Sequence, residues 1–235
     1  MRKFFLSFLA AISFASSSWA ATHVILIRHG QTDWNKERRI QGHTDNLLNE
    51  TGIAQAKMLA EKIAKNFSNI DAIYSSDLQR AYDTALATAE KLNLPVHKKT
   101  GLREVHFGKL EGVLITDPEA QAALAREAQL DKDSPDRKKL WDAPFSPGSE
   151  SFNQNLDRMK QAIIEIAKDH PDQTVLVFSH GRSIKNLFLD TAGTTEPLHL
   201  GNCGMISFAI DLANTAKPIA FQKVEDPGID NPSQK

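Results

Sequence analysis

The chain has 235 residues, of which 41% are hydrophobic and 24% charged, and its 28 lysines and arginines nearly balance its 29 aspartates and glutamates. This composition excludes a disordered chain, a collagen-like repeat and a disulfide scaffold. A formal net charge of −1 argues against nucleic-acid binding, which needs a surplus of basic side chains along many phosphates. We therefore expect one domain, at most two, with a sizeable hydrophobic core.

Residues 1–20 have the pattern of a secretory signal peptide. A basic start leads into an uncharged apolar run over residues 4–14, and the small residues Ser18 and Ala20 then mark a cleavage site before Ala21. The run is shorter than the roughly 20 residues that span a bilayer, although a retained anchor or a buried helix is the alternative. We expect export, to the periplasm or the medium, of a mature chain without stable membrane insertion.

Cys203 is the only cysteine of the chain. An exported protein with a single cysteine has no internal disulfide, so its stability must come from its core. A reactive thiolate needs an activating base or positive surroundings, and the sequence places neither beside it. We therefore interpret Cys203 as a packed residue, not as a nucleophile.

From residue 24 onwards, apolar strands alternate with amphipathic helices. The expected strands, in chain order, are residues 24–27, 70–74, 174–178, 205–210 and 219–224. The expected helices are residues 52–66, capped by Asn49 or Thr51, residues 77–92, capped within Ser75, Ser76 and Asp77, and residues 152–168 and 183–191. This alternation predicts an α/β fold, a three-layer sandwich in which helices cover both faces of a mostly parallel central sheet.

Residues 113–150 interrupt the alternation. A polar helical stretch over residues 118–130 is followed by a charge run over residues 131–139 and a proline-rich turn over residues 143–148. We expect a helical cap inserted over one end of the sheet, with a solvated helical hairpin without function as the alternative. The polar tail from Glu225 is expected to be flexible, so that residues 21–235 form one domain.

Two of the expected strands end in the same way. The first runs into Arg28-His29-Gly30, and the strand at residues 174–178 runs into Ser179-His180-Gly181. Ligands of open α/β sheets bind beyond the carboxyl ends of the strands, so both imidazoles are expected at the ligand-binding edge. A single histidine there is weak evidence, but two in matching positions indicate a site.

A third strand leads to Arg80 in the first turn of its helix, where a cation opposes the helix dipole. An anion held between Arg80 and the helix amides would remove this conflict, whereas a surface pair with Asp77 or Asp83 is the alternative. Together with Arg28 and the two histidines, Arg80 would form a pocket for a tetrahedral dianion. We expect no metal, because zinc-type spacings are absent and Arg28 would repel a divalent cation.

Six motifs of the chain resemble those of the histidine phosphatase superfamily, in its phosphoglycerate-mutase-like branch. They cover most of the mature chain, in the order typical of that family: RHGQTDWN (residues 28–35), RRIQGHTDNLLNETG (38–52), SSDLQRAYDTA (75–85), LREVHFGKLEG (102–112), PGSES (147–151) and SHG (179–181).

This resemblance implies a role for each candidate residue. His29 would attack phosphorus and carry a phosphohistidine, and Glu104 would protonate the leaving oxygen and then activate water. The attack needs a neutral His29, whose pKa two nearby arginines would lower. The residues that would hold the phosphoryl oxygens are Arg28, Arg80 and His180, with further substrate contacts from Asn35 and Gln41. No cofactor is implied.

Three functions remain open at this point. We favour hydrolysis of small phosphate monoesters over a cofactor-dependent phosphoglycerate mutase, because residues 136–141 of the cap lack the arginine pair of such mutases. The second alternative is a non-catalytic phospho-ligand binding module, although the nucleophile and the acid are both present. Within the cap, Trp141 and Phe145 could hold a flat substrate beside the cations at residues 137–139, or could simply be packed. The natural substrate and the oligomeric state cannot be read from the sequence.

Overall fold

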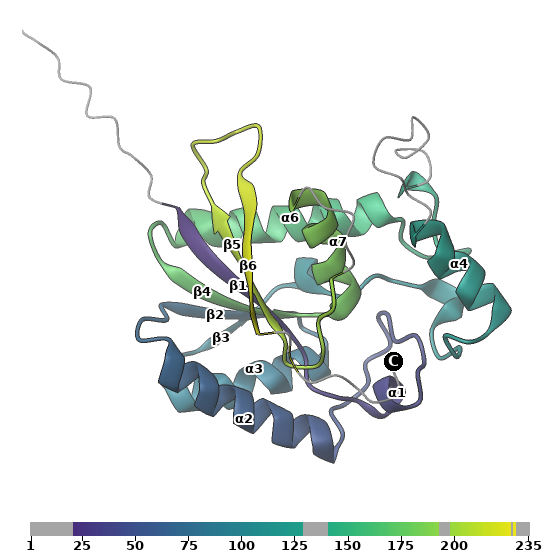
Figure 1. The fold of residues 1–235 in the computed structure, drawn as a ribbon, viewed down its shortest axis with the longest axis horizontal. Helices are drawn as coiled ribbons and strands as arrows, with labels where there is room; N and C mark the ends of the chain where they lie inside the picture. The colour runs from purple at the N-terminus through teal and green to yellow at the C-terminus, as the bar shows by residue number, and fades with distance from the viewer. Residues whose placement is uncertain (1–20, 129–140, 193–197, 227, 229–235) are drawn as a thin grey trace, which may run out of the picture.

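The computed structural model of the chain describes residues 21–128, 141–192, 198–226 and 228. Its centre is a six-stranded sheet in the order β3-β2-β4-β1-β5-β6 (Figure 1). The strands are β1 (Thr22–Arg28), β2 (Ala72–Ser75), β3 (Val96–Lys98), β4 (Thr174–Ser179), β5 (Met205–Ile210) and β6 (Ile219–Asp226). The first four strands of the sheet order run parallel, whereas β5 is antiparallel to both of its neighbours, so the sheet is mixed.

Helices cover both faces of this sheet, which confirms the three-layer α/β fold. The helices are α1 (Asp33–Lys36), α2 (Glu50–Asn66), α3 (Gln79–Leu92), α4 (Pro118–Ala128), α6 (Phe152–Asp169) and α7 (Gly181–Thr191), with 3₁₀ turns η1 (Thr100–Leu102) and η2 (Gly108–Leu110). In Figure 1, α2 and α3 lie below the sheet and α6 and α7 above it. Within the described residues, no helix is both long and apolar enough to cross a membrane.

The alternation of side chains along the strands builds the two core layers. Leu26 of β1 and Val177 of β4 point into the cluster that α6 and α7 cover. Their neighbours Ile27 and Phe178 point into the opposite cluster, against α2 and α3. Because both faces are buried, these strands are continuous apolar runs, which is why the sequence reveals them.

One of the two expected helix caps is confirmed and the other is wrong. Asn49 caps α2, because its side chain accepts a hydrogen bond of 2.9 Å from the amide of Gly52. The cap position of α3 is Leu78, which has no capping side chain. Asp77 is instead bound by the guanidinium of Arg103, at 2.8 and 2.5 Å.

The cap region forms its own small hydrophobic cluster. Ala120 and Ala123 of α4 pack with Phe107, and Phe145 lies 5.2 Å from the Phe107 ring. Trp141 stacks on Phe152 of α6, with 3.8 Å between ring centroids. Both aromatic residues of the cap are therefore packed rather than free to hold a substrate, and the charge run at residues 131–139 lies outside the described residues.

The flexible tail was expected to begin at Glu225, but this start is wrong because the last strand extends beyond it. Glu225 and Asp226 belong to β6, where Asp226 pairs with Met205 of β5. Lys62 of α2 also forms an ion pair with Asp226, which ties the end of β6 to the helical layer. The expected leader, residues 1–20, lies outside the described residues.

Candidate active site

The register of β1 and β4 brings the two histidines together. Arg28 at the end of β1 is the partner of Ser179 at the end of β4, so the next residue of each strand, His29 and His180, leaves the sheet at the same level. Their ring centroids lie 5.2 Å apart. The structure therefore brings His29 and His180 together at one edge of the sheet, as the sequence predicted.

His29 is oriented and kept neutral by its surroundings. Its Nδ1–H donates a hydrogen bond of 2.7 Å to the carbonyl of Gly30, which leaves the lone pair of Nε2 free to act as a nucleophile. Burial, then Arg80 and Arg28, lower the pKa of His29 well below its ordinary value. At neutral pH the ring is uncharged, as a nucleophilic imidazole must be.

A close approach of two glycines fixes the loop that carries His29. A Cβ on Gly30 would lie 2.7 Å from the carbonyl oxygen of Gly52, and a Cβ on Gly52 would lie 2.0 Å from that of Gln31. Only glycine at both positions lets the N-terminus of α2 pack against this loop. Gly30 also donates its amide to the hydroxyl of Thr84 on α3, at 3.0 Å.

His180 is completely buried and lies beside His29. Burial, then the charge of Arg80, lower its pKa well below the ordinary value. Neither ring nitrogen has a hydrogen-bond partner among the described residues. Buried polar atoms are normally satisfied, so these two nitrogens indicate that a ligand or water completes the site.

Arg80 is likewise fully buried, and both carboxylates expected as its alternative partners bind elsewhere. Asp77 is held by Arg103, and Asp83 accepts from Gln79 at 2.5 Å. The Arg80 guanidinium instead donates to the carbonyls of Thr44 and Gly42, at 3.0 and 2.7 Å. Burial lowers the pKa of Arg80 to about 10, so the group stays charged at neutral pH.

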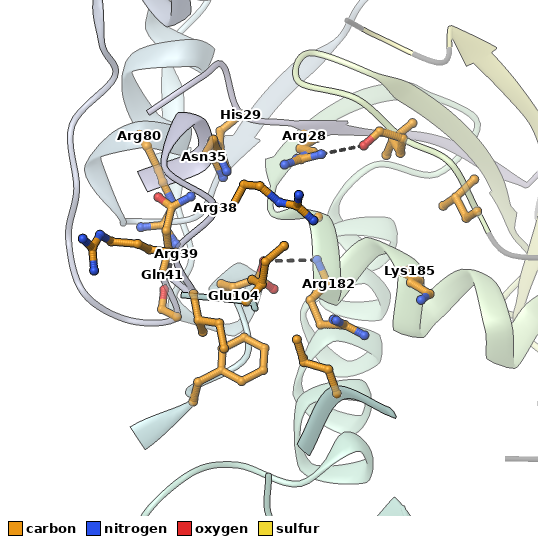
Figure 2. Close-up of a pocket in the computed structure, with 18 of the residues that line it drawn as sticks. Arg28, His29, Asn35, Arg38, Arg39, Gln41, Arg80, Glu104, Arg182 and Lys185 are labelled. Atoms are coloured by element: carbon orange, nitrogen blue, oxygen red, sulfur yellow. Dashed lines mark hydrogen bonds between the residues drawn. The ribbon is translucent and has the colours of Figure 1, made fainter. Parts of the chain in front are cut away.

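Arg28, Asn35 and Gln41 complete the surroundings of His29 (Figure 2). Arg28 is positioned by a hydrogen bond of 2.7 Å from its Nη1 to the carbonyl of Leu200. The side-chain oxygen of Asn35 accepts from the Thr32 amide at 3.2 Å, and that of Gln41 accepts from the Thr32 hydroxyl at 3.0 Å. With their oxygens occupied, the two amide groups can offer N–H donors to an anion.

Glu104 lies across the cavity from His29 and is held by the start of α7. Its Oε1 accepts from the Ser183 amide and hydroxyl, at 2.9 and 3.1 Å, and from the Val105 amide at 3.0 Å. Its Oε2 accepts from the Arg182 amide at 3.1 Å. These donors fix the carboxyl group in one orientation, beside the place where a substrate would lie.

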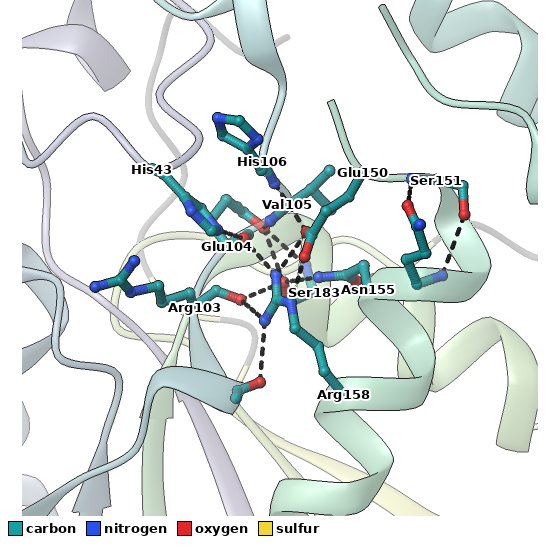
Figure 3. Close-up of polar contacts among 12 residues, drawn as sticks. His43, Arg103, Glu104, Val105, His106, Glu150, Ser151, Asn155, Arg158 and Ser183 are labelled. Atoms are coloured by element: carbon teal, nitrogen blue, oxygen red, sulfur yellow. Dashed lines mark hydrogen bonds and ion pairs between the residues drawn. The ribbon is translucent and has the colours of Figure 1, made fainter. Parts of the chain in front are cut away.

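A network behind Glu104 holds its backbone in place (Figure 3). Arg158 of α6 donates to the carbonyl of Glu104 at 2.6 Å and to that of Arg103 at 2.8 Å. Its guanidinium also binds both oxygens of Glu150, at 2.7 and 2.8 Å. Although burial opposes it, Arg158 holds the pKa of Glu150 below its ordinary value. The PGSES motif thus contributes a positioning carboxylate.

One cavity of about 750 Å³ is lined by the following predicted residues: Arg28, His29, Asn35, Gln41, Arg80 and Glu104. A family model described as the histidine phosphatase superfamily, branch 1, matches residues 24–213. The chain belongs to this superfamily.

Similar proteins of the superfamily span most of the chain. A metal-independent phosphoserine phosphatase of Arabidopsis thaliana is 38% identical over 174 residues, which are 72% of this chain and 68% of that protein. A glucosyl-3-phosphoglycerate phosphatase of Mycobacterium tuberculosis is 35% identical over 178 residues, covering 71% and 74%.

Solved structures show the same fold. A phosphoserine phosphatase mutant of Entamoeba histolytica, in complex with phosphoserine, has a TM-score of 0.69 and 28% identity, covering 88% of this chain and 98% of that one. A phosphoglycerate mutase of Bacillus anthracis has a TM-score of 0.73 and 26% identity, covering 89% and 95%. The expected family and fold are confirmed.

Six of the seven predicted site residues line one cavity of this histidine phosphatase, and the seventh, His180, lies beside His29 without lining the cavity. Sequence reasoning missed four further cations that line this cavity, Arg38, Arg39, Arg182 and Lys185. For Arg182 and Lys185, the only sequence signal is that they lie three residues apart just after the SHG motif. This spacing places both side chains on one side of a helix. In the described residues, no group of three or more histidine, cysteine or acidic side chains could hold a metal ion.

Cys203 is buried, and burial raises the pKa of its thiol to about 12. The thiolate form is therefore disfavoured, in agreement with a packing role rather than a nucleophilic one.

Proposed function

We propose that this chain hydrolyses small phosphate monoesters through a phosphohistidine on His29. The single observation that carries the proposal is a neutral imidazole, with its Nε2 unoccupied, between two buried arginines and opposite the carboxyl group of Glu104. The phosphatase names of the relatives support the same activity.

In the first step, the Nε2 lone pair of His29 forms a bond to phosphorus while the phosphorus–oxygen ester bond breaks. Glu104 gives its proton to the leaving oxygen, so that an alcohol departs instead of an alkoxide. Arg28 and Arg80, with His180 and the amides of the cavity wall, stabilise the charge on the equatorial oxygens.

In the second step, the ionised Glu104 accepts a proton from water as the water oxygen attacks phosphorus. The phosphorus–nitrogen bond breaks, orthophosphate leaves, and His29 and the protonated Glu104 are restored. The mutase alternative would instead return the phosphoryl group to a bound sugar acid; the solved mutase shares the fold, but the relatives with assigned phosphatase names favour water as the acceptor.

The test is to trap the intermediate. We expect the chain, mixed with a radiolabelled phosphate ester and quenched in alkaline denaturant, to retain label as phosphohistidine, and His29→Ala to lose both the label and turnover of p-nitrophenyl phosphate. His23→Ala, on the exposed start of the same strand, is the matched control and should change neither. Substantial turnover by His29→Ala would overturn the mechanism.

We also propose that the chain is exported and that residues 1–20 are removed on the way. The support is the basic, apolar and small-residue order of that segment. We expect N-terminal sequencing of the protein from the native cell envelope or medium to begin at Ala21. An uncleaved chain found only in the cytoplasm would contradict export.

A further inference from the structure

The cavity carries more positive charge than a single phosphoryl group requires. Six cationic side chains line it against one carboxylate, Glu104, and they are Arg28, Arg38, Arg39, Arg80, Arg182 and Lys185. Arg28 and Arg80, next to His29, match the two charges of a phosphate dianion. Arg39 forms an ion pair of 2.6 Å with Glu37. The other three cations of the cavity are Arg38, Arg182, which the charge of Glu104 attracts, and Lys185.

The ammonium group of Lys185 has no negatively charged partner among the described residues, so an anion could bind to it. Its ammonium makes no hydrogen bond or ion pair with any residue that the structure describes, although the side chain is half-buried. Burial and the neighbouring charge of Arg182 lower its pKa to about 8. Holding a partly desolvated cation beside another costs folding free energy, and no described acidic group offsets that cost.

Arg38 approaches the same space from the opposite wall. Its backbone is in the left-handed region, with φ of 59°, which is strained for a residue other than glycine. The Ile115 amide donates to its carbonyl at 2.8 Å and thereby fixes that conformation, while its buried Nε has no partner among the described residues. Figure 2 shows Arg38 and Arg182 reaching into the cavity from two sides, with Lys185 farther along α7.

Apolar side chains form the wall between the cap and the catalytic residues. Phe107, Ile115 and Leu124 line this part of the cavity. Such a wall accommodates a short carbon skeleton but offers no partner for a neutral polar group. The cavity therefore combines a phosphoryl subsite, an apolar wall and a second group of cations.

We propose that Arg38, Arg182 and Lys185 bind a second anionic group of the substrate, so that the preferred substrates are compact phosphomonoesters that also carry a carboxylate or another phosphoryl group. This inference rests on the proposed phosphatase activity. Guanidinium groups match both kinds of anion with paired hydrogen bonds, and a mobile ammonium adds a point charge.

The experiment compares three esters with the same three-carbon skeleton, whose far end carries a hydroxyl, a carboxylate or a second phosphate. At about pH 6.5, where Lys185 is charged, we expect kcat/KM for at least one of the two doubly anionic esters to exceed that of the hydroxyl ester by about tenfold or more, the size of one charge-assisted hydrogen bond. The ester with the larger increase in kcat/KM shows whether the second anionic group is a carboxylate or a phosphate.

Lys185→Met removes the charge and keeps the length of the side chain. We expect the ratio of kcat/KM between the favoured ester and the hydroxyl ester to fall towards one in this variant, and Lys185→Arg to retain most of it. Lys57→Met, an exposed lysine of α2, is the matched control and should leave the ratio unchanged.

The two proposals fail in different ways. If none of the three esters releases phosphate, the phosphatase function itself is wrong. If the hydroxyl ester is hydrolysed as well as the doubly anionic ones, or if Lys185→Met keeps the full preference, the second anion subsite is wrong and the phosphatase stands.

Discussion

At the scale of the residue, the proposed mechanism gives Glu104 the task of protonating the leaving oxygen. Both of its oxygens accept hydrogen bonds from the first turn of α7, and Arg158 fixes its carbonyl from the other side. A carboxyl group held in this way loses little freedom when it meets the ester oxygen. Its contribution should therefore depend on how much the departing oxygen needs a proton.

We expect Glu104→Gln to slow hydrolysis of an alkyl phosphate by about 10²- to 10⁴-fold, the usual size of positioned acid–base catalysis. Release of p-nitrophenolate, which leaves without a proton, should slow much less in the phosphorylation step. Steady-state and burst kinetics with both esters measure this, and Glu61→Gln, exposed on α2, is the control. Equal losses for the two esters would argue against Glu104 as the acid.

At the scale of the element, strongly apolar strands and helices can be predicted from the sequence, whereas elements without an apolar pattern cannot. β1 and β4 are buried on both faces, so their composition alone identifies them and the residues at their ends. β3 has three residues and no buried side chain, and it is held by backbone bonds to β2. Because such an element has no pattern of its own, it could not be predicted.

The same distinction holds within the site. His29 and His180 could be predicted to meet, because parallel strands in register end at one edge of a sheet. The presence of Arg38 and Lys185 at one cavity depends on how a loop and α7 pack, which no local spacing encodes. The hydrogen bond from Arg158 to the carbonyl of Glu104 likewise joins residues that are 54 positions apart. Tertiary packing therefore positions Glu104 and forms the proposed second anion subsite, whereas local motifs contain the residues proposed to react.

At the scale of the whole molecule, the charge is concentrated rather than large. The chain has a formal net charge of −1, yet the cavity is lined by six cations and one carboxylate. At physiological salt, exposed charges are screened beyond about 8 Å, so the rest of the surface adds little to the field inside. The cavity can thus attract a small anion without making the whole protein adhere to polyanions.

Maintaining uncharged histidines in such a cavity has a consequence for stability. The pKa values of His29 and His180 are well below 6.5 in the folded state, mainly because of burial, whereas the unfolded chain keeps values of about 6.5. Below that pH the unfolded state binds protons that the folded state does not, so the free energy of unfolding falls as the pH falls. Each histidine contributes a slope of up to about 1.4 kcal/mol per pH unit.

We therefore expect the free energy of unfolding, measured by urea titration, to decrease between about pH 7.5 and about pH 5.5, before most carboxylates titrate. A variant carrying both His29→Gln and His180→Gln should show a shallower decrease, whatever its absolute stability, because it lacks the two groups that take up protons on unfolding. His43, whose pKa is also lowered by burial, is present in both proteins and cancels in the comparison. Parallel pH profiles would mean that both rings accept protons in the folded state, and a protonated His29 has no lone pair with which to attack phosphorus.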